Sequence, residues 1–411
     1  MSEPVASLTE MDAKQASAHV ADLISEGRLE AAQEFAERAH ERFPGHLSLT
    51  DSLIALRRHF DKPEAALELA ILNAKRHRDR FEDRREQKRP ERPLEPDQRI
   101  FLSGYFYSGS GAVFDFLSDH QGCIPWRPGG EFRLIKFPGG LHALARRHAK
   151  KGKLSTKVLV DLYLHLSGRR IVTVPKGRYD RWKMVNRNSR RLHKAAIARG
   201  YLMRCYEQYL DLIERTRQGP IETDELEQRL RRWVGVALDA AAADADADRI
   251  LIDQAVTAWR LPMAKLAPPS TFIVVHRDPR DQFVEAREVL SRPGRRSTTT
   301  FDFAGTYWKR KRAADRAIPV LEREQGHRFL RLGFEDFVVE HEHSSAWLID
   351  KLGLDGVPRT GASFDPAVSR ENVGKHRREL SARERTVLTT LLLPYLSKHA
   401  GRPPTTGRST A

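Results

Sequence analysis

The sequence predicts an α/β protein in which a parallel sheet flanked by helices follows a small all-α repeat domain. Three observations lead to this prediction. A helical pattern recurs within the first 80 residues, a charged proline-rich segment follows, and beyond Arg99 short apolar runs alternate with longer helical patterns. Such alternation is typical of a parallel sheet, because each parallel strand connection needs a crossover.

The first 80 residues carry an internal repeat. The triplet Glu30-Ala31-Ala32 returns 34 residues later as Glu64-Ala65-Ala66, and the small residues permit close contact between helices. This pattern resembles the tetratricopeptide repeat, in which antiparallel helix pairs stack. An ordinary alanine-rich helical bundle would give a similar pattern. Both interpretations assign residues 1–80 to docking of a protein partner, not to chemistry.

A linker is expected over residues 81–98. Three prolines in this charged stretch remove backbone donors and disfavour a helix in the residue before each. The second domain is then expected over residues 99–400, with a helical insert at about 178–248 and a disordered tail at 401–411. Its expected strands are the apolar runs at 100–103, 170–174, 249–252, 271–275 and 328–332.

Composition limits the partners and the compartment. The 411 residues hold 71 Lys and Arg against 55 Asp and Glu, a net charge of +16, and residues 176–199 are strongly basic. Nucleic acid, a membrane surface and small anionic ligands all attract such a protein, but no specific nucleic-acid motif is present. No apolar run reaches the roughly 18 residues of a membrane span, and no export signal is recognisable. Two cysteines without metal-ligand spacing, Cys123 and Cys205, fit a cytoplasmic protein.

Residues 99–117 have the pattern of a strand, a Ser/Gly-rich turn and an apolar helix. Glycines in the turn permit close backbone approach, and its serines offer hydroxyl donors, so the turn could bind phosphate at the start of the helix. A tight strand-to-helix connection without a ligand would look the same. A nucleotide-hydrolysing P-loop requires GxxxxGK[ST], and Ser110 stands at the lysine position. A kinase is therefore a minor alternative.

Four segments of the chain resemble the sulfotransferases that use 3′-phosphoadenosine 5′-phosphosulfate (PAPS). The turn GYFYSGSG, residues 104–111, matches the family's G-x-x-[RK]-S-G-[TS]-[TSG] everywhere except at Tyr107. The segment HRDPRD, residues 276–281, is similar to the family's R-x-P-R-D motif after a strand. RFLRLGFEDF, from residue 328, and SRENVGKHRREL, residues 369–380, resemble the family's E-D-[LF] segment and C-terminal basic loop.

The resemblance implies a P-loop-like sulfotransferase fold and a PAPS site without a metal. Arg277 would clamp the 3′-phosphate through its planar, bidentate donors, and Lys375 and Arg377 would assist it. The family's serine near this phosphate falls on Glu285, whose carboxylate would repel it. The phosphosulfate would lie against the turn residues Tyr107, Ser108, Gly109, Ser110, Gly111 and Ala112.

Sulfuryl transfer needs a cation near the transferred group and a base for the acceptor proton. Because Tyr107 replaces the family's basic residue, another cation is needed, and Lys136 is a candidate alongside Arg127 and Lys176. Carbohydrate-type members use a glutamate shortly after the phosphosulfate helix, so Glu131 is the preferred base. His142 is the alternative base, and Asp253 is a candidate for orienting the acceptor.

The expected function is therefore cytoplasmic sulfuryl transfer from PAPS to a hydroxyl or amine, with a carbohydrate or glycan as the expected acceptor. Tyr107 and Glu285 also motivate a second hypothesis, a catalytically inactive scaffold with the sulfotransferase fold. A nucleotide-dependent kinase is the third.

Overall fold

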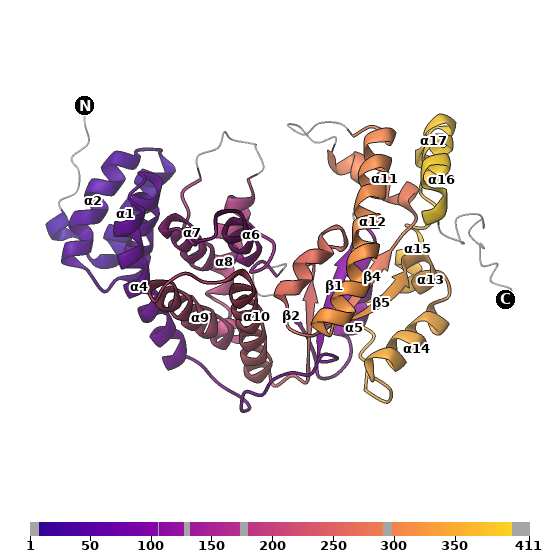
Figure 1. Cartoon of the computed structure of the whole chain (residues 1–411), viewed down its shortest axis with the longest axis horizontal. Helices are drawn as coiled ribbons and strands as arrows, with labels where there is room; N and C mark the ends of the chain where they lie inside the picture. Colours follow the sequence, from indigo (N-terminus) through magenta and orange to yellow (C-terminus); the bar gives the residue numbers. More distant parts are fainter. Residues whose placement is uncertain (1–7, 106, 127–131, 173–179, 291–297, 397–411) are drawn as a thin grey trace. The chain divides into compact units, whose positions relative to one another are not determined.

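The chain folds into two units, each formed by several segments that are separate in the sequence. The computed structural model describes residues 8–105, 107–126, 132–172, 180–290 and 298–396 (Figure 1). The first unit comprises the chain up to residue 94, residues 126–247 and residues 265–268. The second comprises residues 95–125, 248–264 and the chain from residue 269 onward.

The N-terminal region is all-helical, as predicted. The two copies of the Glu-Ala-Ala triplet lie near the starts of α2 and α4, and buried alanines such as Ala32 and Ala36 let neighbouring helices pack closely. Asp12 caps α1 by accepting hydrogen bonds from the amides of Lys14 and Gln15. Assignment to the tetratricopeptide type stays a prediction. The elements are η1 (Leu8–Glu10), α1 (Ala13–Ser25), α2 (Leu29–Arg42), α3 (Leu47–His59) and α4 (Pro63–Asp83).

Helices before and within the expected insert pack with the N-terminal helices in the first unit. Asn73 of α4 donates a 3.0 Å hydrogen bond to the Tyr163 hydroxyl of α7, and His77 stacks on Tyr206 of α9 at 4.9 Å. Buried contacts of this kind are invisible to sequence periodicity. The remaining elements of this unit are α6 (Leu141–Lys151), α7 (Thr156–Ser167), α8 (Arg181–Leu192), η2 (Ala196–Ala198), α9 (Arg199–Arg217) and α10 (Thr223–Ala245).

One expected strand is wrong within the described residues. Residues 170–172 have no regular structure, and the rest of the run at 170–174 lies outside the described residues. The Arg170 carbonyl accepts a hydrogen bond from the Asn186 side chain, and the Arg170 guanidinium pairs with Asp161 of α7. The apolar Ile171 packs against the core of the N-terminal helices. This segment therefore uses its apolar and polar groups against helices instead of in a sheet.

The second unit is built on a sheet of five strands in the order β2-β3-β1-β4-β5. The central strand β1 pairs in parallel with β3 and β4, and β4 pairs in parallel with β5. Four strands lie where the sequence predicts them, whereas β2 was not anticipated. The strands are β1 (Arg99–Gly104), β2 (Cys123–Trp126), β3 (Arg249–Asp253), β4 (Thr271–His276) and β5 (Arg328–Gly333).

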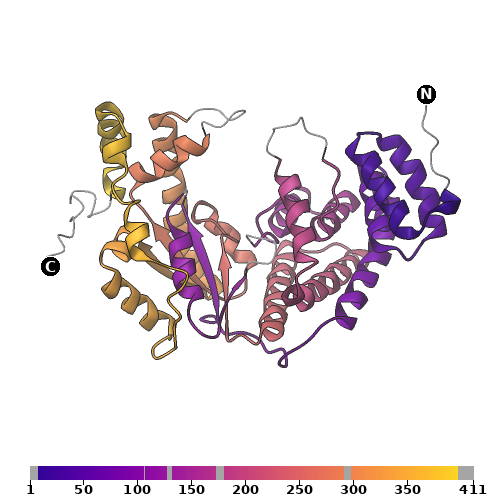
Figure 2. The same cartoon turned by 180° about the vertical axis from the view of Figure 1, so that it is seen from behind.

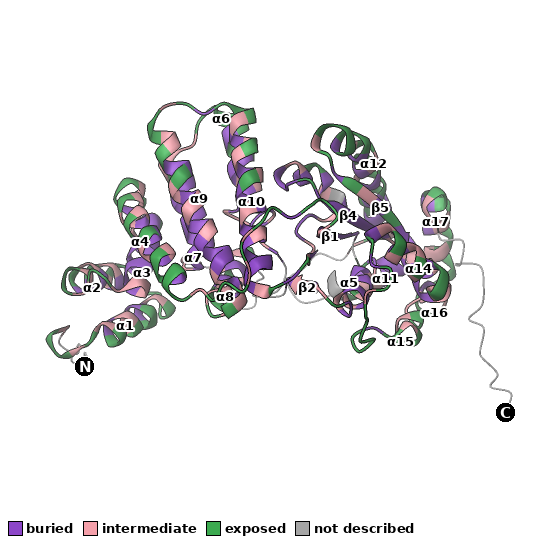
Figure 3. Cartoon of the chain, turned by 90° about the horizontal axis from the view of Figure 1, so that it is seen from below, coloured by how far each residue is buried: buried purple, intermediate pink, exposed green. Residues whose placement is uncertain are grey.

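Helices cover both faces of this sheet. Alternate strand residues such as Ile100 and Leu102 pack against α5 (Ser110–Ser118), α13 (Phe334–Val339) and α14 (His341–Leu352). Figure 2 shows α5, in purple, on that face. On the other face, Tyr307 of α12 contacts Tyr105 at 5.8 Å. Strands β1 and β4 are almost wholly buried, while β5 at the edge is partly exposed (Figure 3). Buried central strands explain their nearly continuous apolar sequence.

The helices of the second unit follow the strands as crossovers and as a C-terminal group. They are α5 (Ser110–Ser118), η3 (Ala258–Leu266), α11 (Pro279–Leu290), α12 (Thr300–Gln325), α13 (Phe334–Val339), α14 (His341–Leu352), α15 (Pro366–Arg370), α16 (His376–Glu379), α17 (Ala382–Leu392) and η4 (Leu393–Tyr395). Among the described residues, no helix has the length and apolar character needed to cross a membrane.

Candidate functional site

The Ser/Gly-rich turn leads from the end of β1 to the start of α5 in a tightly packed conformation. Tyr107 and Gly109 have positive φ values of 49° and 82°. A Cβ atom at Gly104 would lie 2.4 Å from Ser108 Oγ, and one at Gly109 would lie 2.1 Å from the Phe334 ring. Glycine is therefore needed at both positions. With glycine there, the backbone of the Ser/Gly-rich turn lies directly before the start of α5.

The two serine hydroxyls of the turn have different environments. Ser110 Oγ accepts a 2.6 Å hydrogen bond from Gln254 Nε2. Ser108 is buried, and among the described residues no group forms a hydrogen bond with its hydroxyl. A buried hydroxyl without a partner costs free energy, and the oxygen of a bound anion would satisfy it. Gln254, which follows β3 with a φ of 52°, was not singled out from the sequence.

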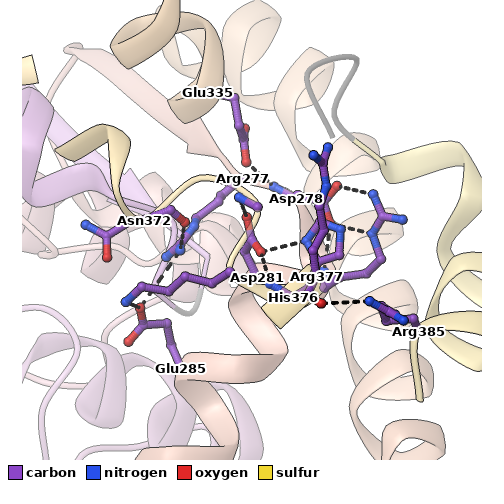
Figure 4. Close-up of polar contacts among 12 residues, drawn as sticks. Arg277, Asp278, Asp281, Glu285, Glu335, Asn372, His376, Arg377 and Arg385 are labelled. Carbon is purple, nitrogen blue, oxygen red and sulfur yellow. Dashed lines mark hydrogen bonds and ion pairs between the residues drawn. The ribbon is translucent and has the colours of Figure 1, made fainter. Parts of the chain in front are cut away.

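Arg277 joins the end of β4 to this turn. Its Nη1 donates a 2.9 Å hydrogen bond to the Tyr107 carbonyl, and its Nη2 donates a 2.7 Å bond to the Asn372 carbonyl (Figure 4). The guanidinium lies 5.3 Å from the centre of the Phe334 ring, and the residue is 5% exposed. Arg277 thus binds together the two segments that the sequence assigned to opposite ends of a nucleotide.

A pocket of about 680 Å³ lies within the second unit at this point. Its lining includes Tyr107 and Arg277, so the turn and the strand-end arginine face one cavity. Ser108, Ser110, Lys375 and Arg377 are not among the lining residues. The lining comprises Tyr107, Gly109, Gly111, Ala112, Asp115, Arg277, Glu285, Phe334, Gly361, Ala362, Ser363, Phe364, Asp365, Val368, Ser369 and Asn372.

Glu285 lies beside the cations expected to bind a phosphate. Lys375 Nζ donates a 2.8 Å hydrogen bond to Glu285 Oε1, and the same oxygen lies 3.9 Å from Arg277 Nη2. The carboxylate therefore partly neutralises both cations. Arg377 follows two residues later, and its carbonyl accepts a 2.7 Å hydrogen bond from Arg385 (Figure 4).

Asp281 anchors the C-terminal basic loop to the start of α11. Its carboxylate accepts hydrogen bonds from the amides of Gly374 and His376, at 2.7 and 2.8 Å, and from His376 Nδ1 at 2.7 Å. Burial raises the pKa of the Asp281 carboxyl, but the hydrogen bonds from His376 and the charges of His376 and Arg277 together lower it below its ordinary value. The second aspartate of the R-x-P-R-D pattern thus has a structural role that its sequence position alone did not reveal.

A second buried carboxylate binds the backbone between β4 and α11. Glu335, from the Glu-Asp pair after β5, accepts a 2.7 Å hydrogen bond from the amide of Asp278. Burial is the main cause that raises the pKa of Glu335 to about 7. The charges of Asp278 and Asp281 contribute in the same direction, and backbone hydrogen bonds oppose them. Asp278 in turn accepts from Arg280 through two guanidinium nitrogens. The residues around Arg277 are therefore held by a network of buried charges.

The candidates for acid–base and electrophilic roles fall outside this pocket's unit or outside the described residues. Glu131, Arg127 and Lys176 lie outside the described residues. Lys136 and His142 belong to the first unit. The Lys136 ammonium lies 5.3 Å from the centre of the Phe137 ring, and His142 is the second residue of α6. Asp253 ends β3 opposite Leu102 of β1. Among the described residues, no cluster of His, Cys, Asp or Glu could hold a metal ion.

Comparison with known families finds a match to part of the chain. The model of the sulfotransferase family matches residues 167–359, which include β3, β4, Arg277 and Glu335. The resemblance to sulfotransferases is confirmed. The sulfotransferase match begins after the Ser/Gly-rich turn, so the turn is supported by its own sequence pattern and geometry. No curated protein matches the sequence.

Two solved sulfotransferase structures are similar to the chain. The sulfotransferase domain from the Synechococcus PCC 7002 olefin synthase is 16% identical, with 74% of this chain and 98% of that chain covered and a TM-score of 0.34. The sulfotransferase STF9 from Mycobacterium avium is 13% identical, with 74% and 76% covered and a TM-score of 0.33.

Proposed function

We propose that the protein transfers a sulfuryl group from PAPS to a hydroxyl or amine acceptor. The observation that carries this proposal is that the Ser/Gly-rich turn and Arg277 line one pocket of the second unit. A volume of about 680 Å³ lies within the range of small-molecule and cofactor sites, about 300–1,000 Å³. The two ends of a doubly anionic nucleotide would each find a donor there.

The residues present fit the anionic groups of such a donor. A Cβ atom at Gly111 would meet no atom within 4 Å, so the start of α5 is open to an oxyanion there, and the helix dipole adds about half a positive charge at that end. The Ser108 hydroxyl offers a donor that no described residue uses. Arg277 and Lys375 supply positive charge for the 3′-phosphate. PAPS itself would supply the activated sulfuryl group, and the proposal requires no metal.

The acceptor and its base belong to the proposal as well. A carbohydrate or glycan is the proposed acceptor class, with Glu131 as the base, His142 as the alternative base and Lys136 as the candidate cation. The protein would act in the cytoplasm, and the N-terminal helices would dock a protein partner. The basic surface supports an anionic acceptor because positive potential steers such molecules.

Titration calorimetry with 3′,5′-ADP tests the donor site. We expect binding in the presence of EDTA, and a loss of at least about tenfold in affinity for Arg277→Ala because charge-assisted hydrogen bonds are among the stronger contacts to phosphate. Arg323→Ala removes an exposed arginine of the same unit and serves as the matched control. Absence of 3′,5′-ADP binding to the unaltered protein would overturn the proposal.

The inactive-scaffold alternative has its own support in the Glu285 carboxylate beside Arg277 and Lys375. Transfer of labelled sulfate from PAPS to any acceptor would exclude it. Binding of 3′,5′-ADP without any transfer across a panel of glycans, phenols and amines would favour it. Magnesium-dependent turnover of ATP would instead favour the kinase alternative.

A further inference from the structure

A second large pocket, of about 490 Å³, lies within the first unit. Helices α3, α4, α7 and α8 and the segments that follow α7 and α8 supply its lining. Its rim gathers six permanently cationic side chains over a floor that contains Asp51, His77 and Ser167. The lining comprises Ser48, Asp51, His77, Arg80, Phe81, Ser167, Arg169, Arg187, Arg190, Arg191, His193 and Lys194.

The cations that line this pocket outnumber its one carboxylate by six to one. Within the described residues, none of the six forms an ion pair with a carboxylate, and the polar contacts that they make are to neutral oxygens such as Ser48 Oγ, 3.1 Å from Arg169. The adjacent Arg170, by contrast, pairs with Asp161, which also pairs with Arg58 and Arg147. The chain therefore pairs one group of arginines internally. The neighbouring group forms no ion pair within the described residues, and the buried charge of Asp51 acts on its members Arg80 and Arg169 from a distance.

The one carboxylate of the lining is already committed. Asp51 accepts hydrogen bonds from the Tyr163 hydroxyl, from Asn73 at 2.8 Å and from His77 Nε2 at 3.2 Å. Burial raises the pKa of Asp51, but the charge of His77, the hydrogen bonds from His77 and Tyr163 and the charge of Arg169 together lower it below its ordinary value. Asp51 thus holds the floor of the pocket together and is not positioned by an ion pair with the rim.

The cationic rim is held at an electrostatic cost. Partial burial lowers the pKa of Arg80 and the positive charge of Arg84 adds to this effect, while the charge of Asp51 opposes it. Partial burial likewise lowers the pKa of Arg190, with Arg169 adding to the effect. The repulsion between like charges on a concave surface is offset when an anion binds between them.

The floor of the pocket supplies an independent indication of a ligand. Ser167 and His77 are each 2% exposed, and Ser167 Oγ and His77 Nδ1 form no hydrogen bond within the described part of the chain. Buried polar atoms in proteins nearly always have partners, and each missing one costs free energy. A solvated basic surface would explain the rim but not these two atoms.

We propose that this pocket binds a small ligand carrying two or more phosphate or sulfate groups. The rim arginines would bind the anionic oxygens by charge-assisted hydrogen bonds, the Ser167 hydroxyl would donate to one of them, and Phe81 would contact the ligand's carbon skeleton. A concave site with a polar floor fits a compact ligand better than an extended polynucleotide, which needs a track of charge. The pocket lies wholly within the first unit, so the proposal is independent of the PAPS site.

Titration calorimetry on the full chain tests this site with two probes. Inositol hexakisphosphate carries phosphates and a trisulfated heparin disaccharide carries sulfates, so their relative affinities distinguish the two sources of oxyanion. We expect at least one probe to bind, and Arg187→Ala/Arg191→Ala to weaken it at least tenfold. Arg28→Ala/Arg38→Ala removes the same charge from exposed positions of the same unit and is expected to change affinity less than twofold.

Ser167→Ala provides a second variant that separates binding from folding. Because the hydroxyl has no partner in the described structure, its removal should leave the unfolding temperature unchanged or raise it, while probe affinity falls several-fold. Equal losses of probe affinity in the two double variants would show that binding depends on net charge alone, and would overturn the proposal. So would the absence of binding by both probes, tighter binding of a single-stranded oligonucleotide, or probe binding that Arg277→Ala abolishes and Arg187→Ala/Arg191→Ala does not.

Discussion

The Glu285 carboxylate lies between two cations: it accepts a 2.8 Å hydrogen bond from Lys375 and lies 3.9 Å from Arg277 (Figure 4). The protein's own anion thus stands where the proposed function expects a 3′-phosphate to be bound. A phosphate entering this place would meet two partly neutralised cations and one repulsive carboxylate. Donor binding should therefore depend on the charge of residue 285.

Glu285→Ser is expected to strengthen binding of 3′,5′-ADP by about tenfold or more, because a repulsive charge worth at least about 1.4 kcal/mol is removed and a hydroxyl donor is added. Titration calorimetry measures the change. Glu288→Ser, an exposed position on the same helix, is the control. Unchanged or weaker binding by Glu285→Ser would show that Glu285 does not oppose the nucleotide.

Asp281→Asn should loosen the C-terminal basic loop. The Asn side chain lacks the negative charge of the carboxylate, which accepts hydrogen bonds from two backbone amides and from His376. We therefore expect the free energy of unfolding to fall by about 1–3 kcal/mol. Urea denaturation measures it, and affinity for 3′,5′-ADP should fall as well because Lys375 lies in this loop. Asp355→Asn, at an exposed position, should leave both quantities unchanged; a wild-type denaturation midpoint for Asp281→Asn would contradict the anchoring role.

Glu335 should make stability depend on pH. Its pKa is raised from 4.5 to about 7, so the folded state binds a proton more tightly than the unfolded state between these values. The contribution of Glu335 to stability is then greatest below about pH 4.5, falls as the pH rises through 7, and levels off above it. The full effect is up to about 3 kcal/mol.

Comparing Glu335→Gln with the unaltered protein isolates this contribution. The amide keeps an oxygen that can accept from the Asp278 amide but cannot ionise. Between pH 5 and 7.5, the difference in unfolding free energy between variant and wild type should increase in favour of the variant. A constant difference across this range would rule out titration of Glu335.

The two glycines of the turn should respond differently to alanine. Gly109→Ala places a Cβ against the Phe334 ring at a positive φ, and we expect a loss of more than about 2 kcal/mol. A Cβ at Gly111 meets no atom within 4 Å, so Gly111→Ala should unfold at nearly the wild-type temperature. Thermal denaturation tests both, and similar losses in the two variants would contradict the packing described for the turn.

Glu131→Gln tests the proposed base. We expect the rate of labelled-sulfate transfer to fall by about 10²–10⁴, as for other general bases, while affinity for 3′,5′-ADP stays unchanged. His142→Gln is the parallel variant for the alternative. A rate loss confined to His142→Gln would exchange the two roles, and full activity in both would exclude both residues.

The predicted sheet agrees with the structure where strands are buried on both faces. Strands β1 and β4 have continuous apolar sequences because both of their faces are covered, and this pattern is visible without coordinates. The run from residue 170 has a similar composition, yet its described part is irregular, because Ile171 packs on helices and Asn186 binds the Arg170 carbonyl. Apolar composition alone does not distinguish a strand from a segment buried against helices.

The site shows the same division. The glycine pattern of the turn and the arginine after β4 are local features, and they identified Gly109 and Arg277. Gln254 and Asp281 were missed because their roles are contacts with residues 144 and 95 positions away in the sequence. No local pattern carries such information.

By itself, the sequence determined the helical N-terminal region, the alternation of strands and helices, and the resemblance to sulfotransferases. These follow from periodicity and from motifs that occupy a few consecutive residues. Only the tertiary structure decided that Glu285 faces Arg277 and Lys375. It also decided that arginines from α4 and α8, which form no ion pair within the described residues, line one pocket with Ser167. The physical reason is that electrostatic interactions and burial depend on distances in space, which separate parts of the chain set only when they fold together.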